Sequence, residues 1–156
     1  MLKTSLIGNP VEHSVAPILH TEIAKSLGMG PNDFSYVKTV VEPEKLAEKF
    51  DALELLGFTG GNVTLPIKID IMQHVDADEA ARFIGAVNTY VFRDGERKGY
   101  NTDWQGVVGS LEHAGLPAEQ RNSFVVLGSG GAARAAIYAA KQLGFRNITV
   151  FHEEEI

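Results

Sequence analysis

The stretch from Ser123 to Phe151 restricts the possible folds of this chain more than any other. Residues 123–127 are typical of a buried strand, and a glycine-rich turn follows them at once. The alanine-rich segment 132–143 then predicts a helix that ends at Gly144, and residues 147–151 predict a second strand. A strand, a helix and a strand in this order predict one βαβ unit.

The turn inside this unit has the pattern G-x-G-x-x-A. Glycines at these positions allow a tight turn and let a pyrophosphate approach the helix N-terminus, while the alanine keeps the helix close to the strand. The pattern alone is weak evidence, but here a strand precedes it and a helix follows it. We therefore expect a dinucleotide cofactor to contact Gly128, Ser129, Gly130, Gly131, Ala132 and Ala133.

Strands and helices also alternate in the residues before this unit. Strands are predicted at residues 5–8, 34–41, 60–64, 86–92 and 98–100, and helices at residues 17–27, 43–56, 70–75, 78–84 and 103–114. The Asp94-Gly95 pair between the last two strands is typical of a hairpin turn. The chain is therefore expected to be an α/β protein, with a mixed sheet covered by helices and then the first βαβ unit of a Rossmann-like domain.

Apolar residues at helical spacing predict which side of three helices faces a core. The stripes are Leu19, Ile23 and Leu27 in the first helix, Leu46, Phe50 and Leu53 in the second, and Val107, Leu111 and Ala114 in the third. We expect all three stripes to be buried, because an amphipathic helix turns its apolar side to the core.

The segment Gly60–Lys68 carries the most reactive combination of side chains. Val63-Thr64 followed by Pro66 predicts a strand that stops sharply, and Lys68 lies just beyond the stop. Asn62, Thr64 and Lys68 would bring an amide, a hydroxyl and an ammonium group to one sheet edge. That set could bind and deprotonate a small polyhydroxylated anion. The alternative is a buried strand followed by a surface lysine.

Further polar residues lie at predicted helix starts. Ser14 precedes the first helix, where hydroxyls and free backbone N–H groups favour anions. Asn101, Thr102 and Asp103 begin the helix that ends near Gly115. Each of these residues could instead serve only as a helix N-cap, and that alternative stays open.

Composition excludes several classes of function. The chain of 156 residues has no cysteine, and its five histidines show no paired ligand spacing, so we predict no disulfide, thiol nucleophile or metal site. The net charge is −6 and the 14 lysines and arginines are scattered, which argues against nucleic acid as a partner. No membrane span and no secretory signal are recognised, so we expect a cytoplasmic location.

Taken together, six segments resemble the shikimate dehydrogenase family in their order along the chain. They are residues 8–14 (GNPVEHS), 17–20 (PILH), 62–68 (NVTLPIK), 85–89 (GAVNT), 99–106 (GYNTDWQG) and 128–134 (GSGGAAR). Six ordered segments are far more specific than any one of them.

The resemblance implies an NADP-dependent oxidoreductase that interconverts 3-dehydroshikimate and shikimate, on the route to chorismate and aromatic amino acids. It implies that Lys68 and Asp103 are the catalytic pair, and that the substrate is bound by Ser14, Asn62, Thr64 and Asn88. Ser14 would hold the carboxylate and the other three the ring hydroxyls. A lysine acts as a base only if its pKa falls, and an adjacent carboxylate opposes that fall. Which of the two groups accepts the proton stays open.

Two departures from the family pattern bear on specificity. The family usually has a second serine two residues after Ser14, where this chain has Ala16; losing a hydroxyl that pairs with a carboxylate costs about 1.5–3 kcal/mol and leaves room for quinate. The family's NADP enzymes carry Asn-Arg-Thr after the second strand of the βαβ unit, where this chain has His152-Glu153-Glu154. An acidic residue there favours NAD over NADP, unless these residues only form a tail.

We divide the chain into a substrate-binding catalytic domain at residues 1–102 and a partial dinucleotide-binding domain at residues 103–156. One βαβ unit cannot cover both faces of its sheet, and the family's chains are substantially longer. We therefore expect a truncated chain, or one that a partner chain completes, and an exposed half-sheet favours a homo-oligomer. The alternatives to a complete dehydrogenase are a substrate-binding fragment without full activity, or an NAD-dependent quinate/shikimate dehydrogenase-like enzyme.

Overall fold

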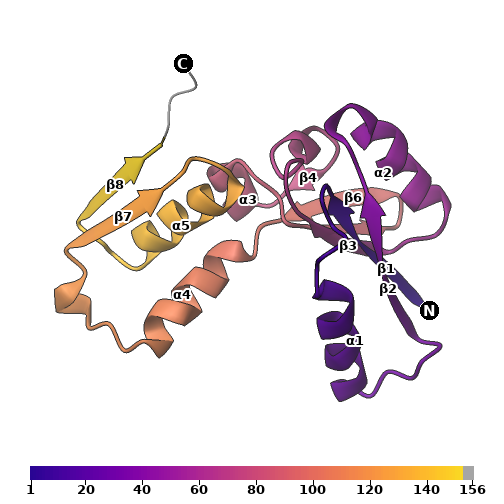
Figure 1. Ribbon diagram of the computed structural model, residues 1–156, viewed down its shortest axis with the longest axis horizontal. Coiled ribbons are helices and arrows are strands. Elements are labelled where there is room, and N and C mark those ends of the chain that lie inside the picture. The colour runs from indigo at the N-terminus through magenta and orange to yellow at the C-terminus, as the bar shows by residue number, and fades with distance from the viewer. Residues whose placement is uncertain (153–156) are drawn as a thin grey trace.

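The strands of the computed structural model, which describes residues 1–152, form two separate sheets (Figure 1). The larger sheet contains β1 (Leu2–Gly8), β2 (Phe34–Val40), β3 (Gly60–Val63), β4 (Asp76–Ala77), β5 (Thr89–Arg93) and β6 (Glu96–Tyr100). The smaller sheet contains β7 (Ser123–Leu127) and β8 (Asn147–Phe151). The helices are α1 (Ala16–Ser26), α2 (Leu46–Leu55), α3 (Glu79–Ile84), α4 (Asp103–His113) and α5 (Gly131–Gln142), with 3₁₀ turns at Pro43–Lys45, Asp70–Gln73 and Ala118–Gln120.

The larger sheet is mixed, as predicted. Its strand order is β2-β1-β3-β5-β6-β4, with β1 parallel to both β2 and β3 and β5 antiparallel to β3. The β5–β6 hairpin closes on Asp94 and Gly95, whose φ angles of 53° and 77° are those of a tight two-residue turn. The two-residue strand β4, which pairs with β6, was not predicted because it is too short to show a pattern.

A parallel βαβ unit follows the mixed sheet, which confirms the expected fold class. Strands β7 and β8 pair in parallel, and α5 connects them. Figure 1 shows this unit beside the larger sheet, with α3, α4 and α5 between the two sheets. No helix in residues 1–152 is long and apolar enough to cross a membrane.

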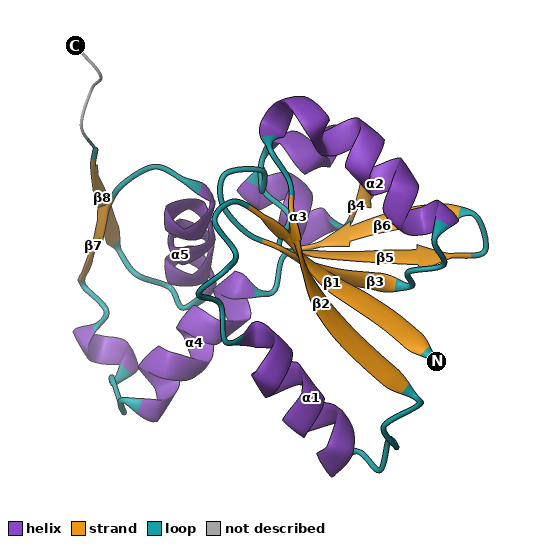
Figure 2. Ribbon diagram, turned by 45° about the vertical axis from the view of Figure 1, so that its right-hand side comes forward, coloured by secondary structure: helices purple, strands orange, loops and turns teal. Residues whose placement is uncertain are grey.

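The main core lies between the larger sheet and α2. The α2 stripe of Leu46, Phe50 and Leu53 is buried, as predicted. Phe50 packs against Tyr90 of β5, with ring centroids 5.1 Å apart. Helix α1 lies on the opposite face of the sheet (Figure 2). The two helices therefore give the sheet a cover on each side, as an α/β layer requires.

The predicted buried stripe of α1 is wrong. Leu19, Ile23 and Leu27 are 56%, 45% and 76% exposed. The helix instead turns Ala16, His20 and Ala24 toward β2, where the His20 ring stacks on Tyr36 at 4.5 Å. These three residues have the same i, i+4, i+8 spacing, so periodicity alone could not choose between the two stripes.

Strand β7 is also less buried than predicted. Only Val126 is buried, because α5 covers one face of the two-stranded sheet, whereas Val125 and Leu127 project from the other face and are exposed. In α4 the predicted stripe is only partly confirmed: Val107 and Leu111 are half-buried, but Ala114 is exposed. The residues 86–88 are buried but precede β5, which begins at Thr89.

A buried hydrogen bond between Ser5 of β1 and Tyr90 of β5 should contribute to the free energy of unfolding. The Tyr90 and Ser5 hydroxyl oxygens lie 3.0 Å apart, and both side chains are fully buried. Replacing Tyr90→Phe should reduce the free energy of unfolding by about 1–3 kcal/mol, because it leaves the Ser5 hydroxyl buried without a partner. Urea denaturation measures the change. The double variant Ser5→Ala/Tyr90→Phe should be more stable than Tyr90→Phe alone, and equal or lower stability would contradict the role of this contact.

The same tyrosine should make the stability of the fold depend on pH. Burial raises the pKa of Tyr90 from its ordinary value of 10.0 to about 12, and its hydrogen bond with Ser5 only partly offsets that effect. The folded state therefore holds the phenolic proton more tightly than the unfolded state. This share of stability should be complete below about pH 10 and be lost as the pH rises through about 12. Urea midpoints measured across this range should fall less steeply in Tyr90→Phe than in the wild type.

Candidate active site around Lys68 and Asp103

An ion pair between Lys68 and Asp103 connects the two parts of the chain. The Lys68 ammonium donates to the Asp103 carboxylate with an Nζ–Oδ2 distance of 2.6 Å. Lys68 lies in the turn that follows β3, and Asp103 is the first residue of α4. The lysine side chain is only 14% exposed, and the Lys68 carbonyl accepts a hydrogen bond from Val87 N–H at 2.8 Å. The position of Lys68 is therefore fixed at both its backbone and its ammonium group, and the alternative of a surface lysine does not apply.

Asn88 holds the other oxygen of the carboxylate. Its amide nitrogen donates to Asp103 Oδ1 at 2.7 Å and to the Thr102 hydroxyl at 2.9 Å. Its amide oxygen accepts from the Thr102 backbone N–H at 3.0 Å. Both carboxylate oxygens of Asp103 are thus engaged, one by Lys68 and one by Asn88. This fixes the orientation of the carboxylate beside the ammonium group.

Asn101 holds the backbone of Asp103. From the sequence this residue was expected only as a possible helix N-cap. Its side chain is buried, donates to the Ala86 carbonyl at 2.9 Å and accepts from the Asp103 backbone N–H at 3.1 Å. Thr102 occupies the N-cap position of α4 but makes no capping bond with its side chain. The polar run Asn101-Thr102-Asp103 was the only sequence signal for this support.

Asn62 joins the same network from β3. Its amide oxygen accepts from the Tyr36 hydroxyl at 2.8 Å, and its nitrogen donates to Thr89 Oγ1 at 3.2 Å and more weakly to the Asn88 carbonyl at 3.4 Å. Burial raises the pKa of Tyr36 above its ordinary value, so its hydroxyl stays a donor. Neither Tyr36 nor Thr89 was predicted as a site residue. Both occupy regular strand positions, where an alternating pattern gives no sign of a polar role.

Thr64 and Ser14 stand apart from this network. The Thr64 backbone N–H donates to the Ile7 carbonyl at 2.9 Å, and the Ser14 hydroxyl accepts from the Ala16 N–H at 3.2 Å. Within residues 1–152, no side-chain hydrogen bond links either residue to Lys68 or Asp103. Of the predicted catalytic and substrate residues, the structure therefore brings together Lys68, Asp103, Asn88 and Asn62.

The glycine-rich turn has room for a ligand. Gly128 has a φ angle of +104°, and neither Gly128 nor Gly130 has an atom within 4 Å of the position that a Cβ would take. The N-terminus of α5 at Gly130 has no side-chain cap. Open backbone and uncapped N–H groups at a helix N-terminus suit a phosphate group, so the turn fits the pyrophosphate of a dinucleotide. The acidic residues Glu153 and Glu154, which bear on NAD against NADP, lie outside the described residues.

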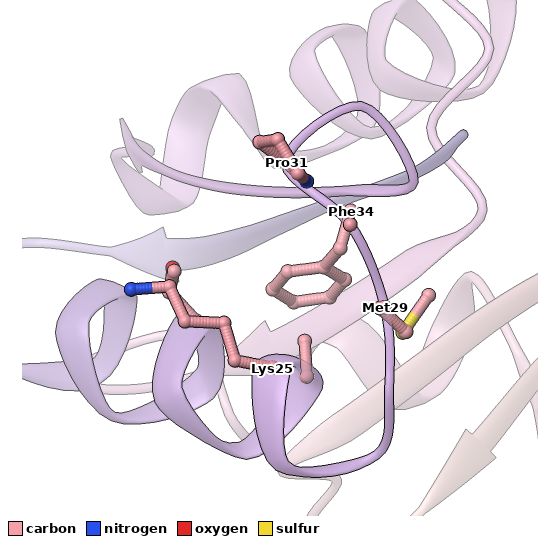
Figure 3. Close-up of a pocket in the computed structure, with 7 residues that line it drawn as sticks. Lys25, Met29, Pro31 and Phe34 are labelled. Atoms are coloured by element: carbon pink, nitrogen blue, oxygen red, sulfur yellow. The ribbon is translucent and has the colours of Figure 1, made fainter.

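A separate apolar pocket shares no residue with this site. It has a volume of about 480 Å³ and lies between α1 and β2, next to Lys25, Met29, Pro31 and Phe34 (Figure 3). Its wall is almost entirely apolar, and it offers no convergent set of donors and acceptors. The Lys68–Asp103 network, with its amides and its carboxylate, is the better candidate for polar chemistry.

Comparison with known proteins gives consistent matches. The chain is 42% identical over 146 residues to the NADP(+) shikimate dehydrogenase of Bacillus cereus strain B4264, which covers 93% of this chain and 52% of that protein. It superposes on shikimate dehydrogenase 1 of Peptoclostridium difficile with a TM-score of 0.90 and 31% identity, over 99% of this chain and 56% of the other.

The enzyme of Thermus thermophilus in complex with shikimate gives a TM-score of 0.87 and 34% identity, over 99% of this chain and 57% of the other. The chain thus spans about half the length of the relatives it matches. The family model described as the shikimate dehydrogenase substrate binding domain matches residues 6–90, which is more than half of the chain. The chain therefore belongs to the shikimate dehydrogenase family through its substrate-binding domain.

Proposed function

We propose that this chain binds shikimate beside Lys68 and Asp103 and supports its NADP-dependent, reversible oxidation to 3-dehydroshikimate. The observation that carries the proposal is the 2.6 Å ion pair, in which Asn88 holds the carboxylate of Asp103 and Asn101 accepts from its backbone N–H. The names of the matched relatives support the same substrate and cofactor.

The chemistry follows from the pair. Oxidation of a secondary alcohol requires a group that takes the hydroxyl proton as hydride leaves the carbon, and reduction of the ketone requires the reverse. Lys68 and Asp103 offer an ammonium and a carboxylate in direct contact, so a hydroxyl seated there meets both a proton donor and a proton acceptor. NADP⁺ supplies the hydride acceptor when it is bound. Asn88 keeps the carboxylate in place while the proton moves.

The other proposed contacts concern recognition. Asn62 and Asn88 lie in the network and present amide groups suited to ring hydroxyls, and Thr64 follows β3 at the same edge. Ser14 lies near the N-terminus of α1, where a substrate carboxylate is favoured. The dinucleotide would lie at the turn of residues 128–133. In this proposal residues 1–102 bind the substrate, and residues 103–156 contribute the first part of the cofactor domain.

A second candidate is a substrate-binding module that does not retain the cofactor. It is favoured by the bare outer face of the small sheet, where Val125, Leu127 and Phe151 are exposed. Calorimetric titration separates the two: the dehydrogenase reading expects both shikimate and NADP⁺ to bind, whereas the module binds shikimate alone and shows no formation of NADPH. Tighter binding of quinate than of shikimate would favour the quinate/shikimate dehydrogenase-like alternative.

Substrate binding should depend on Asn88. Asn88→Ala removes an amide that holds Asp103, and it should weaken shikimate binding by about 1–3 kcal/mol, which is roughly 5- to 150-fold in Kd. Calorimetric titration measures the change. Asn122→Ala, at an exposed asparagine outside the network, should leave the Kd unchanged. An equal effect of both variants would count against this site.

Turnover should depend on Lys68. Lys68→Ala removes one member of the pair that exchanges the hydroxyl proton, so kcat for shikimate oxidation should fall by about 100-fold or more while KM changes far less. NADPH absorbance measures the rate. Lys45→Ala, at an exposed lysine that pairs with Glu48, is the matched control and should behave as the wild type. A raised KM with an unchanged kcat would contradict the proposed role.

A further inference from the structure

Gly131, the first residue of α5, lies against the side chain of Lys68. It is buried, and a Cβ built on it would lie 3.1 Å from Lys68 Cδ, 3.3 Å from Lys68 Cβ and 3.5 Å from Ala86 Cβ. The first two distances are shorter than ordinary van der Waals contacts. The absence of a side chain at Gly131 is therefore what allows the helix N-terminus to approach the lysine stem.

The neighbouring glycines of the same turn behave differently. A Cβ on Gly128 or Gly130 would meet nothing within 4 Å, so these two face open space. Gly131 also stands at a variable position of the G-x-G-x-x-A pattern, which therefore gives no reason for a glycine there. Its φ lies outside the left-handed region, so backbone conformation does not require glycine either. The contact with Lys68 is the reason that the structure offers.

Lys68 is held at three points. Its backbone carbonyl accepts from Val87, its stem lies against Gly131, and its ammonium donates to Asp103. The contacts come from different elements: α5 supplies Gly131, the loop before β5 supplies Val87, and α4 supplies Asp103. A side chain at Gly131, or a displacement of the α5 N-terminus toward the lysine, must therefore push the stem aside.

We propose that Gly131 is a positioning residue for Lys68, which sets the place of the ammonium group at Asp103 through direct contact with the lysine stem. Its importance for catalysis rests on the proposed function, but the contact itself does not. Gly131 was expected from the sequence to contact the dinucleotide, and the present proposal adds a role for it on the substrate side of the same turn. The turn would then serve both halves of the reaction through different glycines.

A double-mutant cycle tests the contact. Gly131→Ala should lower Tm in the wild-type chain, although alanine is the better helix former, because the new methyl group crowds the lysine stem. In the Lys68→Ala background, where Cδ is gone, the same change should lower Tm less or raise it. Gly130→Ala should have equal effects in both backgrounds. Additive effects of Gly131→Ala and Lys68→Ala would overturn the proposal.

Variants that fail to fold also test whether the crowding at position 131 comes from Lys68. If Gly131→Ala does not fold in the wild-type background but folds with Lys68→Ala, the proposal is supported. If Gly131→Ala fails to fold in both backgrounds, the crowding does not come from Lys68 and the proposal is wrong.

Nuclear magnetic resonance reads the position of the lysine directly. The ¹³Cε signal of Lys68, assigned by its loss in Lys68→Ala, should shift in Gly131→Ala and stay at the wild-type position in Gly130→Ala. A Lys68 signal that Gly131→Ala leaves unmoved would overturn the positioning role. Neither experiment uses shikimate or NADP⁺, so a failure of the proposed function would leave their outcomes unaffected.

Discussion

The site depends on the contact between the Lys68 ammonium and the Asp103 carboxylate. These residues are 35 positions apart and reach each other only because the β5–β6 hairpin returns the chain to the edge where β3 ends. Asn88 enters that hairpin and Tyr100 leaves it, and the Asn88 N–H donates to the Tyr100 carbonyl. The sheet thus delivers a lysine, an asparagine and an aspartate to one place. Removing any of its central strands would separate the pair.

The pair is better understood as a positioning device than as a source of stability. A partly buried ion pair gains little net free energy, because the charges lose water, yet leaving one charge unpaired is costly. Asn88 offsets part of that cost, since its amide donates to the Asp103 carboxylate at 2.7 Å, and Asn101 fixes the backbone of Asp103 by accepting from its N–H at 3.1 Å. Both side chains are neutral amides, so they position Asp103 without adding charge to the site.

The sequence predicted the mixed sheet, the βαβ unit and every strand except β4, and it singled out Lys68 and Asp103, which the structure brings into contact. It did not predict which side of α1 is buried, because Ala16, His20 and Ala24 are spaced like the more apolar stripe of Leu19, Ile23 and Leu27. It overestimated the burial of β7, since a strand pattern does not reveal whether both faces of the sheet are covered. Tyr36, Thr89 and Asn101 were missed as site residues because their roles depend on tertiary hydrogen bonds that have no local pattern.

Shikimate is proposed to bind at the Lys68–Asp103 pair. Chemical-shift mapping on the isotopically labelled chain, titrated with shikimate, tests it most directly. We expect saturable shifts for the signals of Asn62, Lys68, Asn88 and Asp103, with no change around Met29 and Phe34 in the apolar pocket. Shifts confined to that pocket, or no shifts at saturating shikimate in a folded chain, would contradict it.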